Sequence, residues 1–193
     1  MNFEPKDHLI ESTKASIIKA AKTLSKNPEQ FQAYYDLAFA DEKKYSARAA
    51  RVLAYLSEID YDVIKPYTEE IAWKMLDMPH DSALMSILKI FTMVPLPEKN
   101  EELLGRIANF CFELMQSGTE RAALRVYSME ILYRISNIEP IIKQELAMVI
   151  TQLNEYGSPG FQSWVRKTLK RLEKEMDDLP ESFFDNYDNY DFE

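Results

Sequence analysis

The sequence has 193 residues, of which 46% are hydrophobic, so a single domain with a sizeable core is expected. Four glycines and one cysteine exclude a glycine-rich phosphate loop and an intramolecular disulfide framework. The net charge of −9 is local, since seven of the 32 acids and none of the 23 Lys and Arg residues lie in residues 177–193. The rest of the chain is therefore nearly neutral.

The first 42 residues predict two helices. An apolar face centred on Ile17 indicates an amphipathic helix that ends near Ser25. The dipeptide Asn27-Pro28 closes this helix and opens the next, because proline fits the first turn of a helix. This pair, residues 1–42, follows a different apolar pattern from the helices after it.

From residue 43 onwards, the sequence predicts three pairs of helices and then one final helix. Proline and glycine supply the breaks, as at Pro95 and Gly118. The predicted ranges are 43–59 with 63–78, 82–94 with 98–117, 120–136 with 140–156, and 158–176. No segment has the alternation of a β-hairpin, so the expected fold class is all-α, with about nine helices. We expect one domain at residues 1–176 and a flexible tail at residues 177–193.

One apolar pattern appears in the first helix of each of the three pairs, at positions i, i+3, i+6 and i+9. The three sets are Ala50, Leu53, Leu56 and Ile59; Met85, Leu88, Phe91 and Val94; and Val126, Met129, Leu132 and Ile135. The second helices repeat a shorter pattern with one small residue at a fixed place. These sets are Ile71, Ala72 and Met75; Ile107, Ala108 and Cys111; and Leu146, Ala147 and Ile150.

A helix pair that recurs at roughly 35 to 45 residues is typical of helical solenoids. The pattern over residues 43–155 resembles HEAT/armadillo-type repeats. The resemblance implies a right-handed α-α superhelix in which the second helices line a concave, partner-binding face. Residues 1–42 would then be a divergent terminal pair that covers one end of the stack. An irregular helical bundle is the alternative fold.

The resemblance implies a binding surface on the concave face, formed by the side of the second helices that points away from the core. Trp73, Asn109 and Met148 are expected to align there, and an aromatic residue among polar ones suits a recognition anchor. The flanking residues are Glu70, Asp77, Arg106, Glu113 and Gln152. The alternative for Trp73 is packing against a neighbouring repeat.

Two further surfaces stand out in the last 30 residues. The final helix carries a basic face of Arg166, Lys167, Lys170, Arg171 and Lys174, which is either an ordinary solvated face or a site for nucleic acid. The tail alternates acids with the aromatic residues Phe183, Phe184, Tyr187, Tyr190 and Phe192. It is either a disordered solubilising end or a peptide that docks on a basic surface, the final helix included.

Residues for catalysis or metal binding are scarce. His8 and His80 are the only histidines, and Cys111 is expected to be a buried apolar residue, so no metal site or cofactor is predicted. We expect a non-enzymatic protein-interaction or scaffold module of the cytoplasm, with a protein or peptide partner and no membrane contact. Nucleic-acid binding through the basic terminal helix and an uncharacterised enzyme with a groove site are the alternatives.

Overall fold

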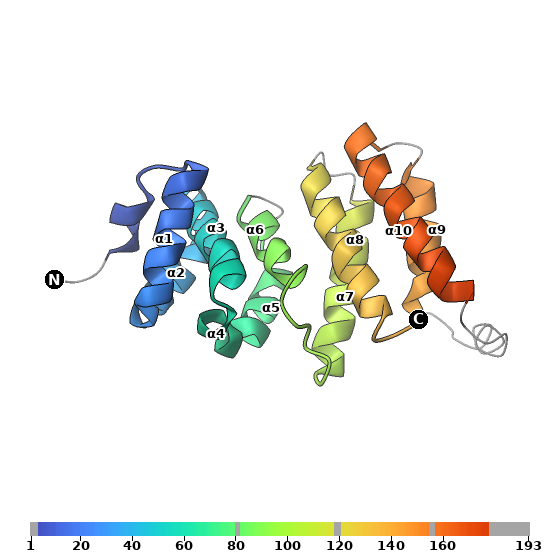
Figure 1. The fold of residues 1–193 in the computed structure, drawn as a ribbon, viewed down its shortest axis with the longest axis horizontal. Coiled ribbons are helices and arrows are strands. Elements are labelled where there is room, and N and C mark those ends of the chain that lie inside the picture. Colours follow the sequence, from blue (N-terminus) through green and yellow to red (C-terminus); the bar gives the residue numbers. More distant parts are fainter. Residues whose placement is uncertain (1–3, 80–81, 118–120, 155–156, 178–193) are drawn as a thin grey trace. The chain divides into compact units, whose positions relative to one another are not determined.

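The computed structural model describes residues 4–79, 82–117, 121–154 and 157–177. Every regular element in these ranges is a helix (Figure 1). The elements are η1 (Pro5–Leu9), α1 (Lys14–Lys26), η2 (Pro28–Gln30), α2 (Phe31–Ala38), α3 (Lys43–Ile59), α4 (Tyr61–Ile64), η3 (Lys65–Tyr67), α5 (Thr68–Leu76), α6 (Ser82–Phe91), α7 (Glu101–Gln116), α8 (Ala122–Ser136), α9 (Ile142–Asn154) and α10 (Pro159–Asp177). If α4, η3 and α5 are counted as one continuous helix, the described residues contain nine α-helices, the predicted number.

Local chemistry sets the helix ends. α3 has the predicted range of 43–59, whereas α7 begins at Glu101, three residues later than predicted. The reason is Asn100, whose side-chain oxygen accepts a hydrogen bond from the backbone N–H of Leu103 at 3.1 Å and so caps the helix. The helix predicted at 63–78 tightens to a 3-10 turn at η3, because Pro66 lacks the N–H that an α-helix needs there.

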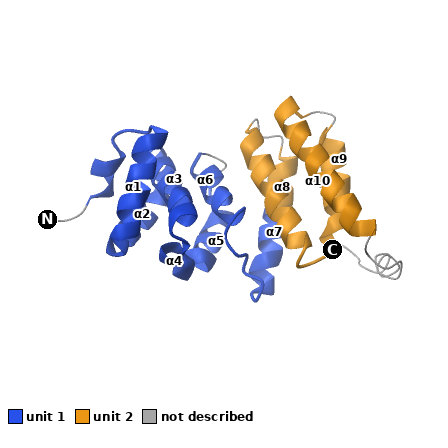
Figure 2. Ribbon diagram, viewed as in Figure 1, with its two compact units in different colours: residues 1–110 blue, residues 111–193 orange. Residues whose placement is uncertain are grey.

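The chain divides into two compact units, residues 1–110 and 111–193, and the division falls within α7 (Figure 2). In unit 1, α3 packs against α1, α2 and α6. In unit 2, α8, α9 and α10 pack against one another. Each unit therefore has its own set of packed helices.

The repeated apolar columns form the cores of these units. Leu53, Leu88 and Leu132, at equivalent places in the first helices, are all fully buried. Ile71, Ile107 and Leu146 of the second helices are equally buried, as is Ala72 beside Ile71. Ile59, which ends the first column, is 41% exposed, and Met85, Val126 and Ala147 are only partly buried.

A cluster of aromatic rings joins α2 to η3 within unit 1. The rings of Phe31 and Tyr67 stack with their centroids 4.2 Å apart, and Tyr35 lies 6.0 Å from both. Burial raises the pKa of the neighbouring Tyr34 to about 12, so this phenol stays neutral at any ordinary pH. Stacked aromatic rings therefore fill the interface between α2 and η3.

A polar network joins α8, α9 and α10 of unit 2. The Glu175 carboxylate on α10 accepts hydrogen bonds from the Tyr133 hydroxyl on α8 and the Lys143 ammonium on α9. Lys143 is buried and also donates to the Asn137 side-chain oxygen at 3.0 Å. Because buried charges are stable only when paired, these contacts fix how α10 lies on α8 and α9.

Candidate functional site

The helix α5 presents the predicted anchor, Trp73, at the surface of unit 1. One side of α5 buries Ile71 and Met75, and the other side exposes Glu70 and Asp77. Trp73 lies on the side away from the buried residues, and its ring is nevertheless half-buried. The helix thus holds an aromatic ring at the surface that is both partly packed and partly accessible.

Arg106 of α7 covers one side of the Trp73 ring. Its guanidinium carbon lies 5.2 Å from the ring centroid, within cation–π range. Arg106 and Asn109 are both exposed on α7. The structure therefore brings Trp73 and Arg106 together.

Lys74 extends this surface towards α2. Its ammonium lies 4.5 Å from the ring centroid of Tyr35 and 5.4 Å from that of Phe39, and it forms an ion pair with Glu70 at 3.6 Å. Burial, together with the nearby Glu70 carboxylate, raises the pKa of Tyr35 well above its ordinary value. The charge of Lys74 is therefore compensated locally, and the surface around it is aromatic rather than basic.

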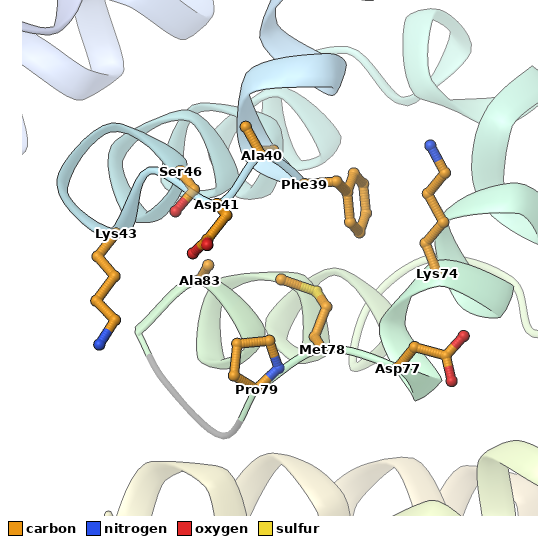
Figure 3. Close-up of a pocket in the computed structure, with 11 residues that line it drawn as sticks. Phe39, Ala40, Asp41, Lys43, Ser46, Lys74, Asp77, Met78, Pro79 and Ala83 are labelled. Atoms are coloured by element: carbon orange, nitrogen blue, oxygen red, sulfur yellow. The ribbon is translucent and has the colours of Figure 1, made fainter.

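A pocket of about 390 Å³ opens beside the C-terminal end of α5 (Figure 3). Asp41 and Lys43 lie on one side of it, and Lys74 and Asp77 on the other. Apolar and small groups supply the remaining lining, namely Ala38, Phe39, Ala40, Ser46, Met78, Pro79 and Ala83. The lining contains two lysines and two aspartates, one of each on either side, so the pocket has no net charge and no preference for a phosphate group.

This pocket was not predicted from the sequence. Its walls come from the chain that follows α2 and from the chain that follows α5, around Phe39 and Met78. Both segments are recognisable as helix ends in the sequence. No pattern within either segment indicates that the two lie opposite each other.

The other predicted residues of this surface belong to unit 2. Glu113 is exposed on α7, and Met148 and Gln152 are exposed on α9, with Met148 at 60%. Met148 and Gln152 line a groove of about 460 Å³ between α9 and α10. The alignment of Met148 with Trp73 stays a prediction.

The basic face of α10 is divided by its neighbours. Arg166, Lys167, Lys170 and Lys174 are exposed. Arg171 instead turns towards α8, where its guanidinium lies 3.4 Å from the Tyr133 ring centroid and 3.2 Å from the Glu130 carboxylate. Arg171 thus contributes to packing within unit 2. The predicted tail residues, Phe183, Phe184, Tyr187, Tyr190 and Phe192, lie outside the described residues.

Metal ligands and the single thiol are the remaining chemical groups of interest in the described ranges. No group of three or more His, Cys, Asp or Glu side chains in these ranges is placed to hold a metal ion. Burial raises the pKa of the Cys111 thiol to about 12, with Ser128 acting in the opposite direction. Among the described helices, none combines the length and apolar character that crossing a membrane requires.

Comparison with known proteins identifies the repeat type. A family model described as a HEAT repeat domain matches residues 6–172. The match confirms the predicted all-α repeat fold and extends beyond residues 43–155 to include the N-terminal pair and most of α10. No curated protein matches the chain significantly. No solved structure does so either.

Proposed function

Because the chain belongs to the HEAT repeat domain family, we propose that it is a non-enzymatic protein-interaction module that binds a protein or peptide partner through the surface around Trp73. HEAT repeats generally serve as protein-interaction scaffolds, and this supports the class of function. We place its action in the cytoplasm, where the single unpaired thiol of Cys111 stays reduced.

The observation that carries the proposal is the combination of Trp73, Arg106 and the pocket at the end of α5. Tryptophan and arginine are the residues most enriched where binding energy concentrates, and here they are in contact before any partner arrives. Such preorganisation lowers the entropic cost of binding. The pocket beside Lys74 and Asp77 then has room for one apolar side chain of the partner.

Charge balance favours a protein partner over nucleic acid at this surface. The pocket holds two lysines and two aspartates, and Lys74 already pairs with Glu70. A nucleic-acid site needs several uncompensated cations to replace the counterions of the phosphates. The exposed cations of α10 keep nucleic acid as the second candidate function.

The test compares three full-length baits in nuclease-treated lysate: the native chain, Trp73→Ala and Trp164→Ala. Trp164 is 40% exposed on α10 in unit 2, so its substitution is a matched control for the loss of a surface tryptophan. We expect a protein that is captured by the native and Trp164→Ala baits and lost from the Trp73→Ala bait, with circular dichroism showing that both variants are folded.

Affinity measurements with that purified partner complete the test. Loss of a central anchor costs about 2 kcal/mol of binding free energy, so the Kd should rise about 30-fold for Trp73→Ala. Ala40→Leu, which adds an apolar side chain at the pocket, is expected to weaken binding as well. Equal affinity of all the variants would contradict the proposed surface. Recovery of nucleic acid from lysate without nuclease, with binding that falls steeply with salt, would favour the second candidate.

A further inference from the structure

The exposed face of α10 carries cations that have no acidic partner among the described residues. Arg166, Lys170 and Lys174 recur every fourth residue, so they form one row along the helix. None of them makes an ion pair within the described ranges, whereas Lys143 and Arg171 do. Glu173 is exposed close to this row, so the face has a surplus of positive charge without being purely basic.

An apolar groove runs beside this row. Ala147 and Met148 of α9 face Leu169 and Met176 of α10 across it, and Thr151, Gln152 and Glu173 complete the lining. Met148 is 60% exposed, the second-highest exposure among the large hydrophobic residues described. No described Lys or Arg lines the groove itself, and Glu173 does, so a ligand that fits would place aromatic rings in the groove and carboxylates on the neighbouring cation row.

The chain itself continues into a segment of this composition. Residues 181–193 contain five acids, five aromatic residues and neither Lys nor Arg. The aromatic residues Phe184, Tyr187 and Tyr190 recur every third position, each followed by an acid. This one segment therefore supplies both the aromatic rings that suit the groove and the carboxylates that suit the cation row.

Length and connection allow this segment to reach the groove. Met176, one residue before the end of α10, lines the groove, and Pro180 disfavours continuation of the helix. Thirteen extended residues span up to about 43 Å, whereas a helix the length of α10 measures about 28 Å. A short tether also gives an effective concentration in the millimolar range, so weak contacts suffice.

We propose that residues 181–193 bind in cis to the α9–α10 groove, with aromatic rings against Met148 and Leu169 and carboxylates on the cations of α10. The occupant is this segment and not a second copy or a nucleic acid. The bound segment shields the cations of α10 and covers the apolar groove. This contact is separate from the proposed partner surface around Trp73.

The test uses the full chain with a nitroxide spin label on Asn189→Cys, because the buried thiol of Cys111 does not compete for the label. Paramagnetic broadening of backbone amide signals is measured by NMR in three backgrounds: the otherwise native chain, Lys170→Glu/Lys174→Glu and Lys19→Glu/Lys22→Glu. The last pair makes the same charge change on exposed lysines of α1 in unit 1.

We expect strong broadening around Leu169 and Met148 that is lost in Lys170→Glu/Lys174→Glu and kept in Lys19→Glu/Lys22→Glu. Added salt should reduce it, because the contact is partly electrostatic. Equal broadening in the two charge-reversed variants would overturn the proposal, since proximity of the tether alone would then explain the signal. So would broadening that appears only when labelled and isotope-enriched molecules are mixed, which would indicate binding between two copies. A single-stranded oligonucleotide that bound α10 without reducing the broadening would also contradict it, because both need the same cations.

Discussion

The ion pair between Lys143 and Glu175 predicts that substituting Glu175 costs more stability than substituting Lys143. Glu175→Gln keeps the shape of the side chain but leaves the Lys143 ammonium without its anionic partner. The Lys143 side chain is 7% exposed and that of Glu175 is 31% exposed. Lys143→Met removes the buried charge at similar volume, and the carboxylate left behind still has water and the Tyr133 hydroxyl.

The magnitudes follow from this difference in burial. Loss of one partner of a fully buried pair costs about 3–5 kcal/mol, whereas an apolar replacement of the buried charge is often nearly neutral. The cost is smaller here, because Glu175 is partly exposed and Lys143 keeps its contact with Asn137 at 3.0 Å. We therefore expect Glu175→Gln to lower the free energy of unfolding by about 2 kcal/mol. Lys143→Met should cost less than about 1 kcal/mol. In a chain of this size, 2 kcal/mol lowers the Tm by about 6 °C.

Urea denaturation measures both effects, with Trp164 fluorescence in a Trp73→Phe background as the reporter on α10. The double variant Lys143→Met/Glu175→Gln should be more stable than Glu175→Gln alone, because no buried charge then lacks a partner. A Lys143→Met variant as destabilised as Glu175→Gln would refute the reasoning.

The same network predicts a dependence on pH. Burial opposes ionisation of Glu175, but hydrogen bonds from Lys143 and Tyr133 outweigh it and hold its pKa below the ordinary value of 4.5. A pKa that is lower in the folded state stabilises the fold fully above the unfolded value, and this contribution is lost as the pH falls through the folded value. The stability difference between the native chain and Glu175→Gln should therefore shrink below about pH 4.5. A difference that stayed constant in acid would argue against an ionised Glu175.

Two further predictions concern single residues. Cys111 is fully buried and its pKa is raised to about 12, so a thiol reagent at pH 8 should modify it in urea and not in the native state; fast native modification would contradict its burial. A Cβ at Gly105 meets no atom within 4 Å, so Gly105→Ala should stabilise α7 by about 0.5–1 kcal/mol in thermal unfolding. Gly157→Ala is the control: a Cβ there would lie 2.4 Å from the Phe161 ring, so this variant should be less stable than the native chain. A Gly157→Ala variant more stable than Gly105→Ala would refute this reasoning.

The sequence predicted the elements that local pattern determines. The first helices carry aliphatic residues at fixed spacing, and Leu53, Leu88 and Leu132 are fully buried as that spacing requires. The family match confirms the repeat type, and it also covers the N-terminal pair, where Tyr34 and Tyr35 occupy buried positions instead of the aliphatic column. That residues 1–176 form one domain stays a prediction.

Features that depend on two distant segments were not predictable in this way. The turn of Arg171 towards Tyr133 follows from the packing of α10 on α8, which no pattern within α10 encodes. The pocket near Phe39 and Met78 arises from two helix ends more than 30 residues apart. The start of α7 is an intermediate case, because Asn100 is a recognisable cap that competes with the proline at position 97 as a helix start.

The stacked rings of Phe31, Tyr35 and Tyr67 bear on how this array can be re-engineered. Repeats whose interfaces share one aliphatic pattern are interchangeable parts, and a copy can be duplicated with its neighbours unaltered. The junction between α2 and η3 depends instead on two aromatic rings whose centroids lie 4.2 Å apart, a fit that an aliphatic neighbour would not reproduce. New repeats should therefore be inserted after α5 when the protein is lengthened. The elements α2, η3 and α5 should be kept together as one unit.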